Sequence, residues 1–230
     1  MSQSSFGNKF KVTTWGESHG KALGAVIDGC PAGLPLCEED IQKFLDRRKP
    51  GQSRYTTARK EGDLVEILSG VFEGKTTGTP ISLMVRNTDQ RSRDYGNIAY
   101  SYRPGHADYT FDQKYGFRDY RGGGRSSGRE TIGRVAAGAI ASKILEELGI
   151  SICTYTRSIG PVEIASFNKE EIHQNAFYMP DAQAAVKAGE YLEECMKNQD
   201  SAGGVIECRI TGTPAGLGEP VFDKLSALLA

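Results

Sequence analysis

The segment from residue 130 to residue 148 has the clearest helical pattern in the chain and limits what can lie beside it. Its sequence, ETIGRVAAGAIASKILEEL, spaces apolar residues at helical intervals, and Gly149 follows at the position where helices commonly end. The apolar stripe consists of Ile132, Val135, Ala139, Ile140, Ile144 and Leu148. Alanine and glycine fill residues 136–139, so a neighbouring backbone can approach closely. The sequence therefore predicts a helix packed tightly against a sheet or a second helix.

Shorter apolar runs, separated by many of the 28 glycines, predict strands and further helices around this segment. Strands are expected at 24–29, 63–74, 79–87, 151–164 and 203–212, with the second and third joined as a hairpin. Helices are expected at 37–49 and 181–198, and Asn168 with Glu171 resembles a helix N-cap and its capping-box partner. The pattern indicates a mixed α/β (α+β) fold in a single domain spanning 1–230.

The last residues, 219–230, begin an amphipathic helix that reaches Ala230 without a glycine, a basic last turn or another stop signal. A cut chain ends in this way more often than a natural one does. We therefore expect the natural chain to continue past Ala230, so that the fold would be incomplete at its C-terminal end.

Composition favours a soluble globular protein, with a hydrophobic fraction of 38% and a mean hydropathy of −0.42. No apolar run approaches the ~20 residues of a membrane span, and the N-terminal MSQSSFGNKF lacks the apolar core of a signal peptide. The five cysteines have no CxxC spacing, which favours free thiols in a reducing compartment. We expect a cytoplasmic protein with no membrane partner and no metal site.

The net charge of −1 hides a strongly basic middle third. Residues 47–134 hold 13 of the 15 arginines and carry +7, with 17 basic against 10 acidic residues, whereas both flanking segments are acidic. Arginine binds phosphate and carboxylate as a planar fork, so this segment favours an anionic ligand. An equally open alternative is that these arginines pair with acidic residues elsewhere in the fold or in a neighbouring subunit.

The strongest local motif, RGGGRSSGRET at 121–131, runs directly into the long helix. Three glycines let a ligand approach the backbone, two serines supply hydroxyls, and the helix start offers unpaired N–H groups. Arg125, Arg129 and Arg134 add full positive charges. The motif is neither a Walker loop nor a dinucleotide fingerprint, because GK[ST] and GxGxxG are both absent. It predicts an anion site, and the alternative is a flexible glycine loop with a serine N-cap.

The chain has three histidines, two of them in loops that contain glycine. His106, in RPGHADY, follows a Pro-Gly turn beside Arg103, inside a long polar segment at 87–128 that we expect to be a loop. There it is either a general acid near an anion or an ordinary loop residue. His19, in WGESHG, is as consistent with a structural role as with a catalytic one. His173 is expected to be a solvated helix residue.

Several stretches, taken in order, resemble signature sequences of the chorismate synthase family. GESHG (16–20) and GRSSGRETIGRVAAGAI (124–140) are similar to two family signatures. Further similar stretches are DRRKPGQSRYTTARKEGD (46–63), NTDQRSRDY (87–95), RPGHADYT (103–110) and DSAGGVIE (200–207). The resemblance runs from about Phe6 to Ala230, whereas family members are usually considerably longer.

The resemblance implies a β-α-β sandwich, a homotetramer and a trans-1,4-elimination. The substrate, 5-enolpyruvylshikimate 3-phosphate, would lose its 3-phosphate and a C6 hydrogen to give chorismate, on the shikimate pathway to the aromatic amino acids. Reduced FMN is required although the reaction has no net redox change, and NADPH is a candidate reductant of the flavin. The leaving phosphate needs charge stabilisation and a proton, which agrees with the basic middle segment.

The resemblance also implies roles for individual residues. His19 would protonate the departing phosphate, and His106 would keep the reduced flavin in the correct protonation state. A phosphate-bearing ligand, either the substrate or NADP, would lie at Arg48 and Arg54. FMN would lie at Arg125, Ser126 and Ser127, and the substrate or the flavin phosphate at Arg103, Arg129 and Arg134.

On the residues alone, two other classes of function stay open. The arginine-rich middle, with its interleaved tyrosines, would suit a module that binds nucleic acid or nucleotides, although the acidic flanks and a net charge near zero speak against it. The chain would otherwise be a structural half of a larger assembly. With the resemblance, the prediction is a small-molecule lyase with no nucleic-acid partner.

Overall fold

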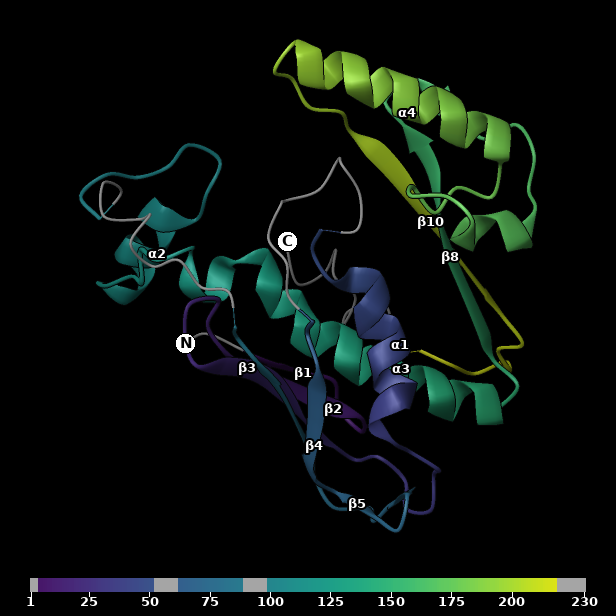
Figure 1. Cartoon of the computed structure of the whole chain (residues 1–230). Coiled ribbons are helices and arrows are strands. Elements are labelled where there is room, and N and C mark those ends of the chain that lie inside the picture. The colour runs from purple at the N-terminus through teal and green to yellow at the C-terminus, as the bar shows by residue number, and fades with distance from the viewer. Residues whose placement is uncertain (1–3, 52–61, 89–98, 219–230) are drawn as a thin grey trace. The chain divides into compact units, whose positions relative to one another are not determined.

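The computed structural model describes residues 4–51, 62–88 and 99–218, and the chain divides into two compact units, 1–144 and 145–230 (Figure 1). Each unit contains an antiparallel sheet and helices, which confirms the predicted mixed α/β class. The single domain over 1–230 stays a prediction, and the two units are described separately. The helix expected at 219–230 lies outside the described residues.

The first unit is built on a five-stranded antiparallel sheet in the order β1-β2-β3-β7-β4. Its strands are β1 (Ser5–Phe6), β2 (Lys11–Gly16), β3 (Ala22–Asp28), β4 (Val65–Ser69) and β7 (Ile81–Arg86). Strands β4 and β7 pair as predicted, but the chain between them forms its own ribbon, β5 (Val71–Phe72) with β6 (Lys75–Thr76). Gly70, at a φ of +83°, makes the bend between β4 and β5, and apolar periodicity does not reveal such a bend.

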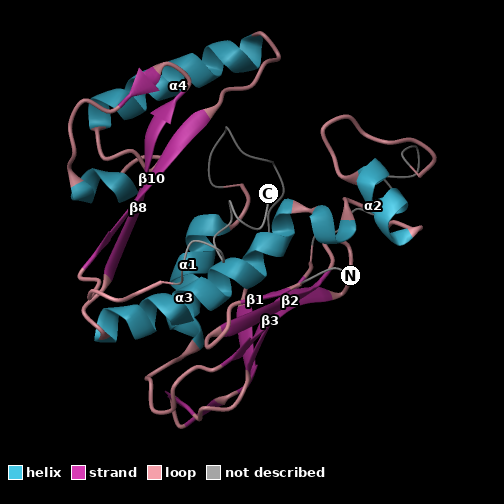
Figure 2. Cartoon of the chain, turned by 180° about the vertical axis from the view of Figure 1, so that it is seen from behind, coloured by secondary structure: helices cyan, strands magenta, loops and turns pink. Residues whose placement is uncertain are grey.

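Two helices, α1 (Glu38–Arg48) and α3 (Thr131–Glu147), cover one face of this sheet (Figures 1 and 2). The buried core joins alternate residues of β3 and β7 to the apolar faces of both helices: Leu23, Ala25, Ile27, Ile81, Leu83, Val85, Ile41, Leu45, Ile132, Ala136 and Ile140. Both predicted helices are therefore confirmed. Leu148 was wrongly placed on the apolar stripe, because the helix ends at Glu147 and Leu148 is 66% exposed.

Gly133 is the position in α3 where a small residue is required, because the helix approaches the sheet closely there. A Cβ built on Gly133 would lie 2.7 Å from the carbonyl oxygen of Gly24 in β3 and 3.0 Å from Cγ2 of Thr14 in β2. A Cβ built on Gly138, further along the same helix, would meet no heavy atom within 4 Å. The close approach of helix to sheet, predicted from residues 136–139, is therefore set at Gly133.

Alanine substitutions at these two glycines should have opposite effects on stability. We expect Gly138→Ala to raise the free energy of unfolding by about 0.5–1 kcal/mol, because alanine loses less backbone entropy in a helix than glycine does. We expect Gly133→Ala to lower it by about 1–3 kcal/mol, because the added methyl group overpacks the contact with β3. Urea denaturation of both variants measures the two changes, and equal changes would contradict this packing.

The polar segment 87–128 is not the continuous loop that the sequence predicts. Its described part contains α2 (Asp108–Tyr115), which ends at Gly116 with a left-handed φ of 69°. Two short 3-10 turns, η2 (Gly124–Ser126) and η3 (Gly128–Glu130), then lead into α3. Asp108 is the buried residue of α2, so this helix has no apolar face that a hydrophobic pattern could reveal.

The second unit is a three-stranded antiparallel sheet in the order β10-β8-β9, with one long helix. Strands β8 (Ser151–Ile159), β9 (Val162–Glu163) and β10 (Gly204–Thr211) and helix α4 (Ala182–Lys197) confirm the predicted elements. Asn168 caps a 3-10 helix, η4 (Lys169–His173), rather than an α-helix, and His173 is exposed as expected. Over the residues that the structure describes, no helix combines the length and apolar character needed to cross a membrane.

Candidate active site

His19 lies in the turn between β2 and β3, and it is buried, with 7% of its surface exposed. Its Nδ1 lies 3.1 Å from Oγ of Ser18, and that hydroxyl donates to the carbonyl oxygen of Gly122 at 3.3 Å. A hydroxyl has a single proton, so the Ser18 oxygen is left to accept from Nδ1–H of His19. The turn thus determines which ring nitrogen carries the proton when His19 is neutral.

The glycine loop comes directly against this histidine. Gly122, Gly123 and Gly124 have left-handed φ angles of 62°, 85° and 54°. A Cβ built on Gly122 would lie 2.1 Å from Cε1 and 2.3 Å from Nδ1 of His19. The N–H of Ser18 also donates to the carbonyl oxygen of Gly124 at 3.4 Å. The glycines that the sequence assigns to a ligand therefore also make room for the His19 ring.

A carboxylate, that of Asp119, is held close to this histidine. Asp119 accepts from Nε of Arg121 at 2.8 Å and from the Arg121 backbone N–H at 3.0 Å. Burial by itself raises the pKa of Asp119, but the hydrogen bonds from Arg121 and the nearby His19 charge outweigh it and lower the pKa overall. The carboxylate is therefore kept ionised near the predicted proton donor.

Arg125 ties the glycine loop to the sheet. Its Nη1 donates to the carbonyl oxygen of Gly16 at 3.0 Å, and its Nη2 donates to the hydroxyl of Thr14 at 2.7 Å and to the carbonyl oxygen of Thr14 at 3.2 Å. Nη2 also lies 3.6 Å from Oε1 of Glu130. In the structure, Arg125 therefore fixes the loop on β2, and its predicted contact with FMN stays a prediction.

The two serines of the loop have different partners. Ser126 is exposed, and its hydroxyl donates to the carbonyl oxygen of Gly123 at 2.7 Å. Ser127 is an N-cap, as the alternative reading of this loop expects, since its Oγ accepts from the backbone N–H of Arg129 at 3.3 Å. A Cβ built on the exposed Gly128 would meet no heavy atom within 4 Å, so the space beside the serines is open.

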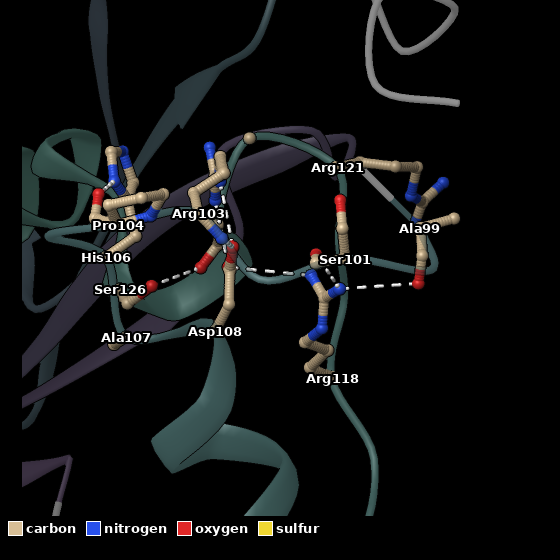
Figure 3. Close-up of polar contacts among 12 residues, drawn as sticks. Ala99, Ser101, Arg103, Pro104, His106, Ala107, Asp108, Arg118, Arg121 and Ser126 are labelled. Carbon is tan, nitrogen blue, oxygen red and sulfur yellow. Dashed lines mark hydrogen bonds and ion pairs between the residues drawn. The ribbon is translucent and has the colours of Figure 1, made fainter. Parts of the chain in front are cut away.

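A second loop, carrying Arg103 and His106, meets the glycine loop (Figure 3). The buried Asp108 accepts from Nε and Nη2 of Arg103 at 2.9 and 3.0 Å. A Cβ built on Gly123 would lie 3.6 Å from Nη2 of Arg103, which places this arginine against the glycine loop. His106 is exposed, and its Nδ1 lies 3.1 Å from the carbonyl oxygen of Pro104. Because a carbonyl only accepts, this bond puts the proton of a neutral His106 ring on Nδ1.

Asp108 should make the stability of the protein depend on pH. Hydrogen bonds from the guanidinium and the backbone N–H of Arg103 lower the pKa of Asp108 to about 2, compared with ~3.9 for an unfolded aspartate. Its stabilising contribution is therefore present above about pH 4 and is lost as the pH falls towards about 2. We expect the difference in Tm between the wild type and Asp108→Asn, measured by circular dichroism, to narrow through this window. A constant difference across it would contradict the expectation.

Arg48 and Arg129 share one buried carboxylate, that of Asp63. Oδ2 of Asp63 accepts from Nη1 of Arg48 at 2.8 Å, and Oδ1 accepts from Nη2 of Arg129 at 3.1 Å. The side chain of Asp63 is 0% exposed, and that of Arg129 is 6% exposed. Two predicted ligand-binding arginines, far apart in the sequence, are therefore brought to one point in the first unit. The other predicted arginine of this set, Arg54, lies outside the described residues.

Much of the basic charge of residues 47–134 is paired with acidic residues of the same segment. Arg134, for example, donates to Glu130 at 2.8 Å and lies over the ring of Phe6. In the described part of this segment, the arginines that contact a carboxylate include Arg48, Arg86, Arg103, Arg118, Arg121, Arg125, Arg129 and Arg134. The carboxylates in these pairs all belong to the segment itself, so the alternative of pairing with acids elsewhere in the fold or in a neighbouring subunit stays untested. These pairs leave the net charge of +7 of the segment unchanged, so the anionic ligand stays a prediction.

The sequence interpretation assigned no role to three polar residues that organise the site: Asp63, Asn87 and Asp108. Asp63 and Asp108 bind predicted arginines, and Asn87 accepts from Nε and Nη2 of Arg129 at 3.1 and 2.9 Å. Their one sequence signal is that each lies in a stretch similar to a family motif. Across the described part of the chain, no group of three or more His, Cys, Asp or Glu side chains is arranged to hold a metal ion.

Comparison with known proteins agrees with these motifs. The chorismate synthase family model matches residues 10–230. The chorismate synthases of Agathobacter rectalis and Lachnoclostridium phytofermentans are 70% and 68% identical over 232 aligned residues, which cover 100% of this chain and 63% of each relative. This chain therefore spans less than two thirds of the length of these relatives.

A solved structure described as the crystal structure of chorismate synthase has the same fold. It matches with a TM-score of 0.73 and 35% sequence identity, over 92% of this chain and 60% of that one. The family match, the identity to the curated relatives and the shared fold lead to one conclusion: the chain belongs to the chorismate synthase family.

Proposed function

We propose that the protein containing this chain is a chorismate synthase, a lyase of the shikimate pathway that converts 5-enolpyruvylshikimate 3-phosphate into chorismate and phosphate. In this elimination the C3–O bond to the phosphate and the C6–H bond break, and a new C=C bond forms without net oxidation. The observation that carries the proposal is the buried His19, packed against Gly122 of a glycine loop that Arg103 also meets. The imidazole of His19 and the guanidinium of Arg103 thus lie against the same loop, which is similar to a family signature.

The proposed chemistry of this chain's residues starts with His19. It would donate a proton to the oxygen of the departing phosphate, with Ser18 fixing the orientation of its ring. The substrate carries a phosphate and two carboxylates, and arginine forks suit all three. In the proposal these groups are held by Arg48, Arg54, Arg103, Arg129 and Arg134. Ion pairs hold Arg48, Arg103, Arg129 and Arg134 in place and would keep their donors preorganised.

The loop also fits a flavin phosphate, because exposed hydroxyl and backbone groups lie there beside open space. Ser126 is exposed, and a Cβ on Gly128 would meet no heavy atom within 4 Å. Ser126 and Ser127 would hold FMN, with Arg125 fixing the loop that presents them. Reduced FMN, when bound, supplies an electron-rich ring beside the substrate. His106, with its Nδ1 held by Pro104, would hold or move a proton at the flavin through Nε2.

A fluorescence titration with FMN tests the cofactor part of the proposal most simply. We expect this chain to quench the flavin fluorescence saturably, and Ser126→Ala to weaken the binding. A matched titration with random single-stranded DNA should show no comparable affinity, whereas DNA binding that weakens steeply with salt would favour a nucleic-acid module instead. Absence of FMN binding would leave this chain as a structural part of a larger assembly.

The proposal extends to the reductant and to the assembly. NADPH would reduce the flavin, with its phosphate at Arg48 and Arg54, and anaerobic loss of the oxidised flavin absorbance after NADPH addition tests this. The family resemblance also supports a cytoplasmic homotetramer without nucleic-acid or membrane partners. Sedimentation velocity of the protein measures its assembly.

A further inference from the structure

The side chain of Asn87, at the end of the neighbouring strand β7, holds the turn that carries His19. This residue directly follows β7 and is half-buried. Its Nδ2 donates to the carbonyl oxygens of Glu17 at 3.0 Å and Gly20 at 2.9 Å, one on each side of Ser18 and His19. Its backbone N–H donates to the carbonyl oxygen of Lys21 at 3.1 Å. Asn87 therefore bridges the two ends of the turn.

The other end of the Asn87 amide is fixed by charge. Its Oδ1 accepts from Nε of Arg129 at 3.1 Å and from Nη2 at 2.9 Å, and Arg129 is itself held by the buried Asp63. A guanidinium only donates and backbone carbonyls only accept, so one amide orientation satisfies both sides and the flipped one satisfies neither. A continuous chain of hydrogen bonds thus runs from Asp63 through Arg129 and Asn87 to the His19 turn.

We infer that Asn87 is a positioning residue, which sets the place of the His19 ring relative to Arg129 and the glycine loop. The inference rests on the proposed function, in which His19 gives a proton to the phosphate and Arg129 binds an anionic group. Asn87 acts by holding the peptide groups on both sides of His19, and its side chain hydrogen-bonds to these groups and to Arg129. Catalysis is sensitive to such placement, since an error of ~1 Å in a catalytic group costs about 10²-fold in rate.

The histidine side chains report this placement directly, because the chain has only three of them. Asn87→Asp keeps the size of the side chain and the acceptor for Arg129, but it turns an oxygen towards the carbonyls of Glu17 and Gly20. Asn175→Asp is the matched control: its Nδ2 also bridges two carbonyls, those of Glu171 and Met179, at 2.8 Å each, in the second unit. Imidazole NMR signals of histidine-labelled protein are recorded for both variants, and His19→Gln assigns the His19 signal.

We expect Asn87→Asp to shift the His19 signal and to leave His106 and His173 in place, while Asn175→Asp leaves His19 in place. Should Asn87→Asp fail to fold, Asn87→Ser removes the same two hydrogen bonds without adding charge and should shift the same signal. A His19 signal at its wild-type position in the folded Asn87 variants would overturn the inference. So would a His19 shift of equal size in Asn175→Asp.

Turnover of the protein that contains this chain gives a second, separate readout. We expect Asn87→Asp to lower kcat by about 10²-fold and to change KM much less, because a misplaced proton donor slows chemistry more than it weakens substrate binding. A raised KM with an unchanged kcat would overturn the inference. Absence of phosphate release in the unaltered enzyme would instead refute the proposed function, and the NMR comparison would still decide the role of Asn87, because it needs no turnover.

Discussion

An alanine in place of Gly122 is expected to push the His19 ring out of its position and to remove most of the catalytic rate. The added Cβ would lie 2.1 Å from Cε1 and 2.3 Å from Nδ1 of His19, far inside van der Waals contact. The ring cannot move away without breaking the hydrogen bond between its Nδ1 and Ser18. Because ~1 Å of misplacement costs about 10²-fold, we expect phosphate release by the proposed enzyme to fall at least that far.

Gly116→Ala is the matched control for this substitution. Gly116 has a φ of 69°, close to the 62° of Gly122, but a Cβ there would meet no heavy atom within 4 Å. In both variants the left-handed backbone should lower the free energy of unfolding by about 1–2 kcal/mol. Only Gly122→Ala should also lower the rate of phosphate release. Similar rates in the two variants, at similar stabilities measured by urea denaturation, would contradict the placement of His19 against the glycine loop.

Asp63→Asn is expected to destabilise the protein more than any surface substitution. The carboxylate of Asp63 is 0% exposed and pairs with Arg48 at 2.8 Å and with Arg129 at 3.1 Å. Asparagine keeps the shape and tolerates the left-handed φ of 46° at this position, so the change isolates the charge. Removing one partner of a buried ion pair costs about 3–5 kcal/mol, because it leaves buried charge uncompensated. Urea denaturation measures this loss.

The control for Asp63 is an exposed ion pair on the same sheet. Glu66 and Arg86 lie 2.9 Å apart, with 45% and 65% of their side chains exposed. Since water and salt screen such pairs, we expect Glu66→Gln to change the free energy of unfolding by less than about 1 kcal/mol. If Asp63→Asn costs no more than Glu66→Gln, then Asp63 does not organise the two arginines.

Periodic segments of the sequence predicted the helices α1, α3 and α4 and the strands from β3 onwards that pair in the two main sheets, but β1 and β2 were not predicted. The helix α3 and the strands β3 and β7 bury residues at the spacing that reveals them, and the structure has them where they are expected, as it has β8. The helix α2 was missed because its buried residue is Asp108, an acid held by arginines, and no apolar stripe marks it. The ribbon β5-β6 was missed because two-residue strands have no period.

For the site, the sequence predicted candidate functional residues but not the residues that hold them in place by hydrogen bonds. His19, Arg103 and the glycine loop were all singled out, and the structure brings them together. The residues that fix them, Asp63 and Asn87, act through hydrogen bonds to segments tens of positions away, as Asn87 does on Gly20. Such contacts leave no local pattern, because they depend on how the strands are ordered in the sheet. For the same reason, the sequence did not reveal which carboxylates the arginines contact.

We propose that His19, packed against the glycine loop, gives the proton in a chorismate synthase reaction. The most direct test replaces the matching residues of the Agathobacter rectalis enzyme, 70% identical over 232 residues, by this chain. The hybrid is then given 5-enolpyruvylshikimate 3-phosphate and reduced FMN without oxygen. We predict that phosphate and chorismate appear in equal amounts and that His19→Gln lowers the rate by roughly 10²–10⁴-fold. An unchanged rate in His19→Gln, or no phosphate release by the hybrid where the unaltered relative releases it, would contradict this account.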